Sequence, residues 1–228
     1  MYNNSYYAAP ASRAQESSLM QRVSYLLAAT LLVTAGSAYW AGMINLSPGL
    51  LLPLFIVGLV LVVGMNFAKA NPALGLLMMF GFSVVEGLII GPLLWTIMRG
   101  YPLGSQIVGE AALLSAVLVA GLGTYSWMSA KDFGSMGRTL FFALIGLLIV
   151  GVIGMFVHFG GGFSLLYSLI GTAIFCGFVL YDVSNIKLRY GPNDYVVATL
   201  QLYLDFLNIF LFLLQILMQL SGGGRRSD

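Results

Sequence analysis

The 228-residue chain is 59% hydrophobic and only 8% charged, with a mean hydropathy of +0.93, whereas soluble domains carry roughly a quarter charged residues. This composition excludes a water-soluble globular fold and indicates that the main solvent of the chain is a lipid bilayer. The formal net charge of +2 comes from scattered basic residues, which excludes a nucleic-acid-binding patch. The one cysteine, Cys176, excludes a disulfide framework and a cysteine metal cluster.

Seven apolar runs follow one another along the chain, separated by short polar connections. A helix needs about 20 mostly apolar residues to cross a bilayer, and these runs are of that order. We therefore predict an all-α polytopic membrane protein, a bundle of seven transmembrane helices at residues 23–44, 50–67, 74–98, 107–129, 140–159, 165–183 and 195–220. The second run is the shortest, so it could also be tilted or partly re-entrant.

The polar ends of the chain divide it into three parts. We expect residues 1–22 to form a flexible cytoplasmic tail, residues 23–220 the membrane domain, and residues 221–228 a short C-terminal tail. Basic residues favour the side of the membrane on which the chain begins, and cytoplasmic loops carry an excess of such residues. Seven basic residues lie on the N-terminal side: Arg13, Arg22, Lys69, Lys131, Arg138, Lys187 and Arg189. Three lie on the other side: Arg99, Arg225 and Arg226. The N-terminus is thus predicted inside the cell and the C-terminus outside.

Four acidic residues lie within or at the edge of the apolar runs: Glu86, Glu110, Asp182 and Asp205. An ionised acid near the bilayer centre costs about 2.5 to 3.5 kcal/mol on insertion scales. Each such acid therefore needs a partner, a water-filled cavity or a proton. Glu110 is within one turn of a helix end, where it can reach the interface, so we interpret it as a solvated structural residue.

Asp182 and Asp205 are predicted to meet. The turn between their helices is best placed at residues 191–194, Gly-Pro-Asn-Asp, which combines a helix stop with a helix cap. One aspartate precedes this turn by nine residues and the other follows it by eleven, so at about 1.5 Å per residue their depths differ by about 3 Å. Two carboxyl groups in contact in a low-dielectric bundle should share one proton. A Ca²⁺ ion, which prefers oxygen ligands, could replace that proton.

A polar stripe on the last predicted helix supports an inward-facing site. Its members follow helical spacing: Gln201, Asp205, Asn208, Gln215 and Gln219. Such a stripe should face protein rather than lipid. It could line a cation path, for which we select Gln201 and Asn208, or it could only hold helices together by hydrogen bonds.

Three sequence segments resemble the Bax inhibitor-1 family, particularly its bacterial YccA-like members. They are GLIIGPLL at residues 87–94, YDVSNIK at residues 181–187 and LYLDFLNIF at residues 202–210. The resemblance covers the chain beyond the N-terminal tail. It implies a seven-helix bundle whose last helix lies near the centre, and a pH-sensitive Ca²⁺ leak in a bacterial inner membrane that is governed by Asp182 and Asp205.

The resemblance also implies a latch and a partner. In some family members an arginine after the second helix pairs with the aspartates, and Lys69 stands at that position here. A lysine lacks the planar two-pronged donor of arginine, so the latch could be weaker or absent. Glu86 could add a cation-binding step to the same path or pair with Lys69. Bacterial relatives are associated with the membrane-bound AAA protease FtsH, so a non-conducting modulator or substrate of that protease is the alternative function, with residues 1–22 as the contact.

The enzymes with comparable membrane motifs do not match this chain, and we expect no enzymatic activity and no required cofactor. Intramembrane aspartyl proteases carry Gly-x-Gly-Asp at the second acid, whereas Leu202-Tyr203-Leu204 precedes Asp205. The chain also lacks the Gly-x-Ser-x-Gly motif of a rhomboid-type serine protease, and His158 is its one histidine. The expected partners are the bilayer, Ca²⁺, protons and the protease.

Overall fold

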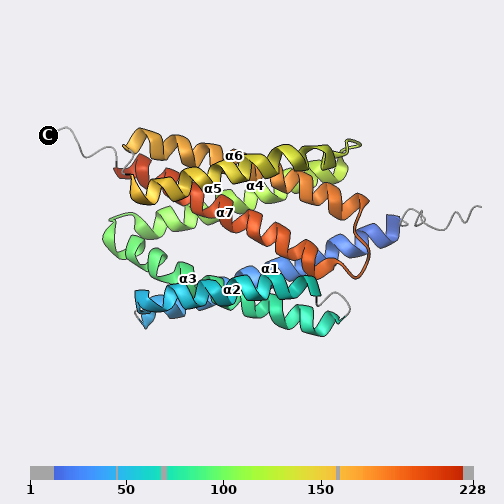
Figure 1. The fold of residues 1–228 in the computed structure, drawn as a ribbon, viewed down its shortest axis with the longest axis horizontal. Helices are drawn as coiled ribbons and strands as arrows, with labels where there is room; N and C mark the ends of the chain where they lie inside the picture. Colours follow the sequence, from blue (N-terminus) through green and yellow to red (C-terminus); the bar gives the residue numbers. More distant parts are fainter. Residues whose placement is uncertain (1–12, 45, 68–70, 158–159, 223–228) are drawn as a thin grey trace, which may run out of the picture.

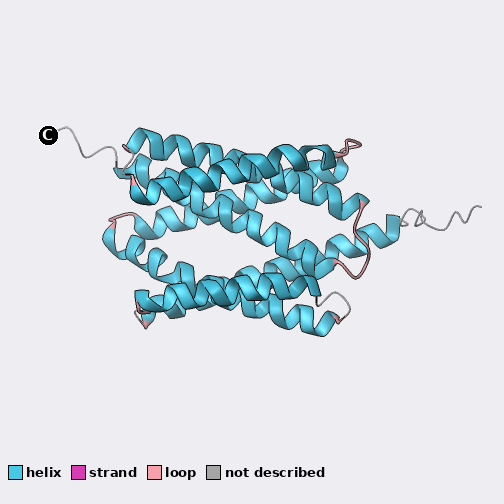
Figure 2. Cartoon of the chain, viewed as in Figure 1, coloured by secondary structure: helices cyan, strands magenta, loops and turns pink. Residues whose placement is uncertain are grey.

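Helices account for nearly all of the described chain. The computed structural model describes residues 13–44, 46–67, 71–157 and 160–222, and these ranges contain no strand (Figure 2). The helices are α1 (Arg13–Met43), α2 (Leu51–Phe67), α3 (Pro72–Gly100), α4 (Gly104–Met128), α5 (Gly137–Phe156), α6 (Gly161–Leu188) and α7 (Tyr195–Gly222). Two short 3-10 helices, η1 (Pro48–Leu50) and η3 (Phe133–Met136), precede α2 and α5.

All seven long helices are apolar enough to cross a membrane, which confirms the predicted class of fold. With η1, the second span covers the 20 residues Pro48–Phe67, so it is long enough to cross fully rather than to re-enter. The spans alternate in direction, and the start of α1 and the end of α7 lie at opposite ends of the bundle (Figure 1). Six of the seven basic residues predicted on the N-terminal side are described, and all lie at the end of the bundle where α1 starts (Figure 1). They are Arg13, Arg22, Lys131, Arg138, Lys187 and Arg189.

The first helix begins earlier than predicted. It starts at Arg13 rather than at residue 23, so residues 13–22 are helical and do not belong to a flexible tail. The prediction placed the boundary at the first apolar run, but hydropathy marks where a helix enters lipid and not where it begins. Leu19 and Val23 are buried and belong to a cluster with Val179 and Val183 of α6. This packing stabilises the additional turns.

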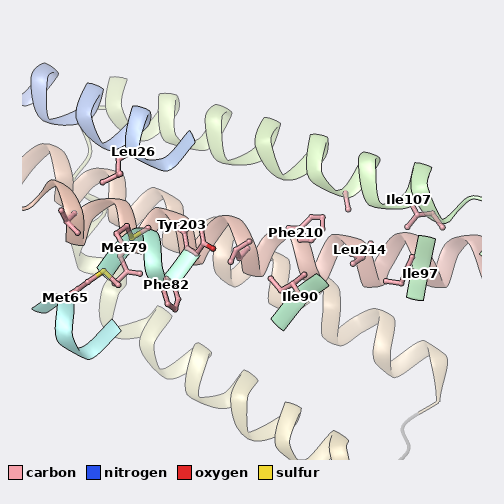
Figure 3. Close-up of a cluster of buried hydrophobic side chains, with 14 residues drawn as sticks. Leu26, Met65, Met79, Phe82, Ile90, Ile97, Ile107, Tyr203, Phe210 and Leu214 are labelled. Carbon is pink, nitrogen blue, oxygen red and sulfur yellow. The ribbon is translucent and has the colours of Figure 1, made fainter. Parts of the chain in front are cut away.

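Helix α7 is the centre of the bundle. In its most apolar 18-residue segment, 56% of the residues are buried, compared with 39% or less in the corresponding segment of each other helix. The helix packs against α1, α2, α3, α4 and α6. Figure 3 shows one of its contact faces, where Tyr203, Phe210 and Leu214 meet Phe82 and Ile90 of α3. The helix that carries the polar stripe is therefore the one most shielded from lipid.

The most extensive helix contact is between α1 and α3, and two glycines make it possible. A Cβ atom on Gly87 would overlap the Ser37 hydroxyl and the Thr34 carbonyl, and one on Gly91 would overlap the Ala38 carbonyl. Small residues four apart let helix backbones approach in this way. The GLIIGPLL segment thus acts in helix packing, which holds α1 and α3 together as one unit.

We expect Gly87→Ala to destabilise the protein, because its methyl group has no room between α1 and α3. Overpacking of this kind costs about 1–3 kcal/mol. Thermal unfolding in detergent, followed by circular dichroism, should show a lower midpoint than wild type. Gly109→Ala is the matched control, since a Cβ there meets nothing within 4 Å, and it should leave the midpoint unchanged or slightly raised. Equal midpoints for both variants would contradict the packing argument.

Candidate functional site

The structure brings Asp182 and Asp205 together between α6 and α7. Each residue is only 4% exposed, the two carboxyl groups interact with each other, and both line the same cavity. Helix α6 ends at Leu188, and Asp194 starts α7 by accepting from the Ala198 N–H through its carbonyl, at 2.9 Å. Two ionised carboxylates can only accept hydrogen bonds, so a hydrogen bond between them requires one proton.

The aspartate pair lines a cavity of about 520 Å³ between α5, α6 and α7. Most of the wall is aromatic or aliphatic, and the polar side chains on it include Asp182, Gln201, Asp205 and Asn208. The Oδ2 atom of Asp205 is buried and has no hydrogen-bond partner among the described residues. A buried polar atom without a partner costs about 1–3 kcal/mol, so this oxygen favours a proton donor or a cation beside it.

The polar stripe of α7 divides into two parts. Toward the end of the helix, Gln215 and Gln219 both donate to the Ser164 hydroxyl of α6, at 2.9 Å and 3.0 Å. These two residues hold α7 against α6, as the alternative interpretation of the stripe proposed. Asn208 donates to the Leu204 carbonyl of its own helix at 2.7 Å. Its amide oxygen is therefore the atom that can serve a ligand in the cavity.

Gln201 stands at the other end of the cavity and is tied to the turn that joins α6 and α7. Its Oε1 atom accepts a hydrogen bond from the Tyr190 hydroxyl at 2.7 Å. Because this oxygen is already used, Gln201 is a weaker candidate cation ligand than Asn208. The bond fixes the rim of the cavity instead.

Glu86 does not reach the aspartate cavity. It lies on α3, with its Oε1 atom 3.9 Å from where a Cβ atom on Gly58 of α2 would be. It is half-buried, and it interacts electrostatically with Tyr203 on the other side of α7. The structure therefore separates Glu86 from the pair. Lys69, the predicted latch, lies outside the described residues.

Two polar groups were missed by the sequence analysis. In the first, the Tyr203 hydroxyl lies 2.6 Å from the Thr34 hydroxyl, which itself donates to the Thr30 or Ser83 carbonyl. The Thr34 proton is thus engaged, so Tyr203 donates. Tyr203 precedes Asp205 by two residues and therefore lies on the opposite face of the helix. This position could have indicated a second polar contact.

The second missed group is an ion pair at the end of the bundle where α1 starts. Both terminal nitrogens of Arg189 donate to Asp132, at 3.0 Å and 2.6 Å, and the Ser184 hydroxyl also donates to this carboxylate. Beside it, Lys187 Nζ donates to the Trp127 and Ser129 carbonyls at the end of α4. The bonds anchor the last turn of α6, which begins two residues beyond Asp182, to the connection between α4 and α5.

Comparison with known proteins gives one consistent family. The family described as Inhibitor of apoptosis-promoting Bax1 matches residues 16–222. Bax inhibitor 1 of Schizosaccharomyces pombe is 26% identical over 97% of this chain and 84% of its own length. Uncharacterized protein Cj0236c of Campylobacter jejuni is 30% identical over 92% of this chain and 93% of its own. Golgi anti-apoptotic protein of vaccinia virus is 32% identical over 75% of this chain and 69% of its own length.

The ion pair at Asp132 gives a prediction about pH. The Arg189 guanidinium, together with the Gly134 N–H, lowers the pKa of Asp132 from 3.8 to about 2. Because the folded-state pKa is lowered, the stabilisation by this pair is complete above the ordinary pKa and is lost as pH falls through about 2. In Arg189→Gln, we expect the Asp132 pKa to return toward 3.8, measured by ¹³C NMR of the labelled carboxyl group. Lys131→Gln is the control and should leave the pKa low; an unchanged value in Arg189→Gln would refute the assignment.

Proposed function

This chain belongs to the Bax inhibitor family of membrane proteins, and from that premise we propose that it is a pH-sensitive calcium leak gated by Asp182 and Asp205. The observation that supports this most is the contact of two buried carboxyl groups on neighbouring helices, at the wall of a cavity. Glu110 lies at the edge of its span and is exposed. Its carboxylate accepts a hydrogen bond from the Gln106 amide at 2.7 Å. It has no part in the gate.

The proton on the pair would control the contact between α6 and α7. With one proton shared, a hydrogen bond joins the two carboxyl groups and holds the helices together. When that proton leaves, two like charges face each other where water screens them poorly, and they repel. The start of α6 is held at Ser164 and its end by the Asp132–Arg189 pair, so we expect the helix to move between these two anchors.

Calcium is proposed as the permeant ion rather than as a resident one. A Ca²⁺ site takes 6 to 8 oxygen ligands, and the cavity offers the two carboxyl groups and the Asn208 amide oxygen. Among the described residues, no third acidic, histidine or cysteine side chain completes a metal cluster. A site with so few protein ligands binds an ion weakly, which suits passage more than storage. The same proposal places the protein in a bacterial inner membrane with its N-terminus inside.

The proposal is tested by Ca²⁺ flux into proteoliposomes between about pH 5 and about pH 9. Wild-type flux should rise as the pair loses its shared proton, and Asp182→Asn and Asp205→Asn should each lose most of this pH dependence, because an amide cannot exchange the proton. Glu110→Gln is the matched control, since it removes an acid of the membrane domain that is remote from the cavity. Its pH profile should equal that of wild type.

Two results would contradict the channel. Flux that is absent from wild type at every pH, or unchanged in both aspartate variants, would leave the non-conducting modulator of an AAA protease as the function. That function predicts instead that truncating the predicted tail, residues 1–22, abolishes protease binding while the aspartates tolerate substitution. Deleting only residues 1–12, which precede α1, is the variant that leaves the helix whole.

Lys69 is proposed as the cationic latch of the closed state. If its ammonium group neutralises the pair, Lys69→Ala should raise Ca²⁺ flux near neutral pH, and Lys69→Arg should lower it because guanidinium binds carboxylates with two parallel bonds. The same flux measurement serves for both variants. Equal flux in Lys69→Ala, Lys69→Arg and wild type would remove Lys69 from the gate.

A further inference from the structure

We infer that a groove between α1 and α4 binds one anionic phospholipid, with an acyl chain lying in the groove. The groove has a volume of about 450 Å³. Its sides are formed by α1 and α4, and its floor by Val183 of α6 with Leu202 and Phe206 of α7. It lies on the other side of the α6–α7 contact from the aspartate cavity, and it plays no part in the gate proposed above.

Small side chains keep the groove open. On α1 they are Ser24 and Ala28, and on α4 they are Ala116, Ala120 and Gly123. Helix α1 packs against α3, α6 and α7, but it makes no extensive contact with α4. The space between these two helices is therefore not filled by side chains of the described chain. Because it lies within the membrane-spanning part of both helices, hydrocarbon is the solvent that meets it.

The groove has a polar end. A second hollow of about 320 Å³ adjoins it, shares Met20, Ser24 and Trp127 with it, and adds Ser17, Gln21 and Tyr25. Hydroxyl, amide and indole groups therefore stand at one end of an apolar channel. This is the arrangement that an amphiphile with a polar head and a hydrocarbon chain requires.

The length of the groove fits one acyl chain better than a helix. From Trp127 to Ala116 the groove follows α4 for eleven residues, which is about 16 Å, or roughly half of the hydrocarbon thickness of a bilayer. A transmembrane helix has to cross the whole hydrocarbon layer, so it is about twice as long as the groove. The occupant is thus a chain from one leaflet.

The charge around the polar end favours an anionic head group. Arg22 follows Gln21 on α1, and Lys131 lies four residues beyond Trp127, and both are exposed. Lys187 Nζ is bound to the Trp127 carbonyl at 2.8 Å. Asp132, an acid close to this end, is neutralised by Arg189. Basic residues at the bilayer surface attract anionic lipids.

The test is lipid retention by the full-length protein. The protein is reconstituted in vesicles of equimolar phosphatidylglycerol and phosphatidylcholine and extracted into detergent, and bound phospholipid is counted by native mass spectrometry. We expect one phosphatidylglycerol per wild-type chain. Ala120→Trp fills the groove and should lower the retained fraction about fivefold or more, which corresponds to about 1 kcal/mol of binding.

Controls separate the groove from the lipid-facing surface in general. Ala173→Trp places the same ring on an exposed position of α6 and should retain lipid like wild type. Ala28→Leu narrows the groove more gently and should also reduce retention, so the test does not depend on one variant. Replacing Arg22 and Lys131 together by Gln should abolish the preference for phosphatidylglycerol. Equal retention in Ala120→Trp and Ala173→Trp, or no headgroup preference in wild type, would overturn the inference.

Discussion

The contact between Asp182 and Asp205 is the constraint on which the arrangement of the last two helices depends. Two acids can be buried in a bundle of this composition only if their charge is reduced and their oxygens are partnered. A proton shared by the two carboxyl groups would meet the first need but would leave Asp205 Oδ2 without a partner. Because one oxygen of the pair still has no hydrogen-bond partner in the described part of the chain, the contact can exist in a protonated and a deprotonated state. A purely apolar contact at the same place could not respond to a proton.

The surroundings of the pair show how such a contact is kept in register. Polar bonds at both ends of the α6–α7 hairpin, at Ser164 and at Tyr190, fix the two helices along their length. On the other side of α7, Tyr203 is bonded to Thr34 of α1, which fixes the rotation of the helix about its axis. The aspartates are thus positioned by hydrogen bonds made elsewhere, in a membrane interior where few other directional interactions are present.

Local patterns predicted the fold well, whereas long-range polar contacts were beyond them. The seven spans follow from hydropathy, and the approach of Asp182 to Asp205 follows from counting residues on either side of one turn. The start of α1 was misplaced because polar residues can extend a helix that tertiary packing supports. Asp132 and Arg189 are 57 residues apart and Thr34 and Tyr203 are 169 apart, so no periodicity relates them. For Glu86 two interpretations stayed open, because its position along one helix does not show which neighbouring helix its side chain meets.

The central position of α7 has a consequence for how the protein is made. Chains leave the ribosome from the N-terminus, so the helix that contacts most of the others is the last to enter the membrane. Until then, the inner faces of α1, α3, α4 and α6 have no partner except lipid or one another. Assembly of the bundle is therefore completed by its final segment, and a chain that ended before Tyr195 would present to the cell a set of spans without their common core.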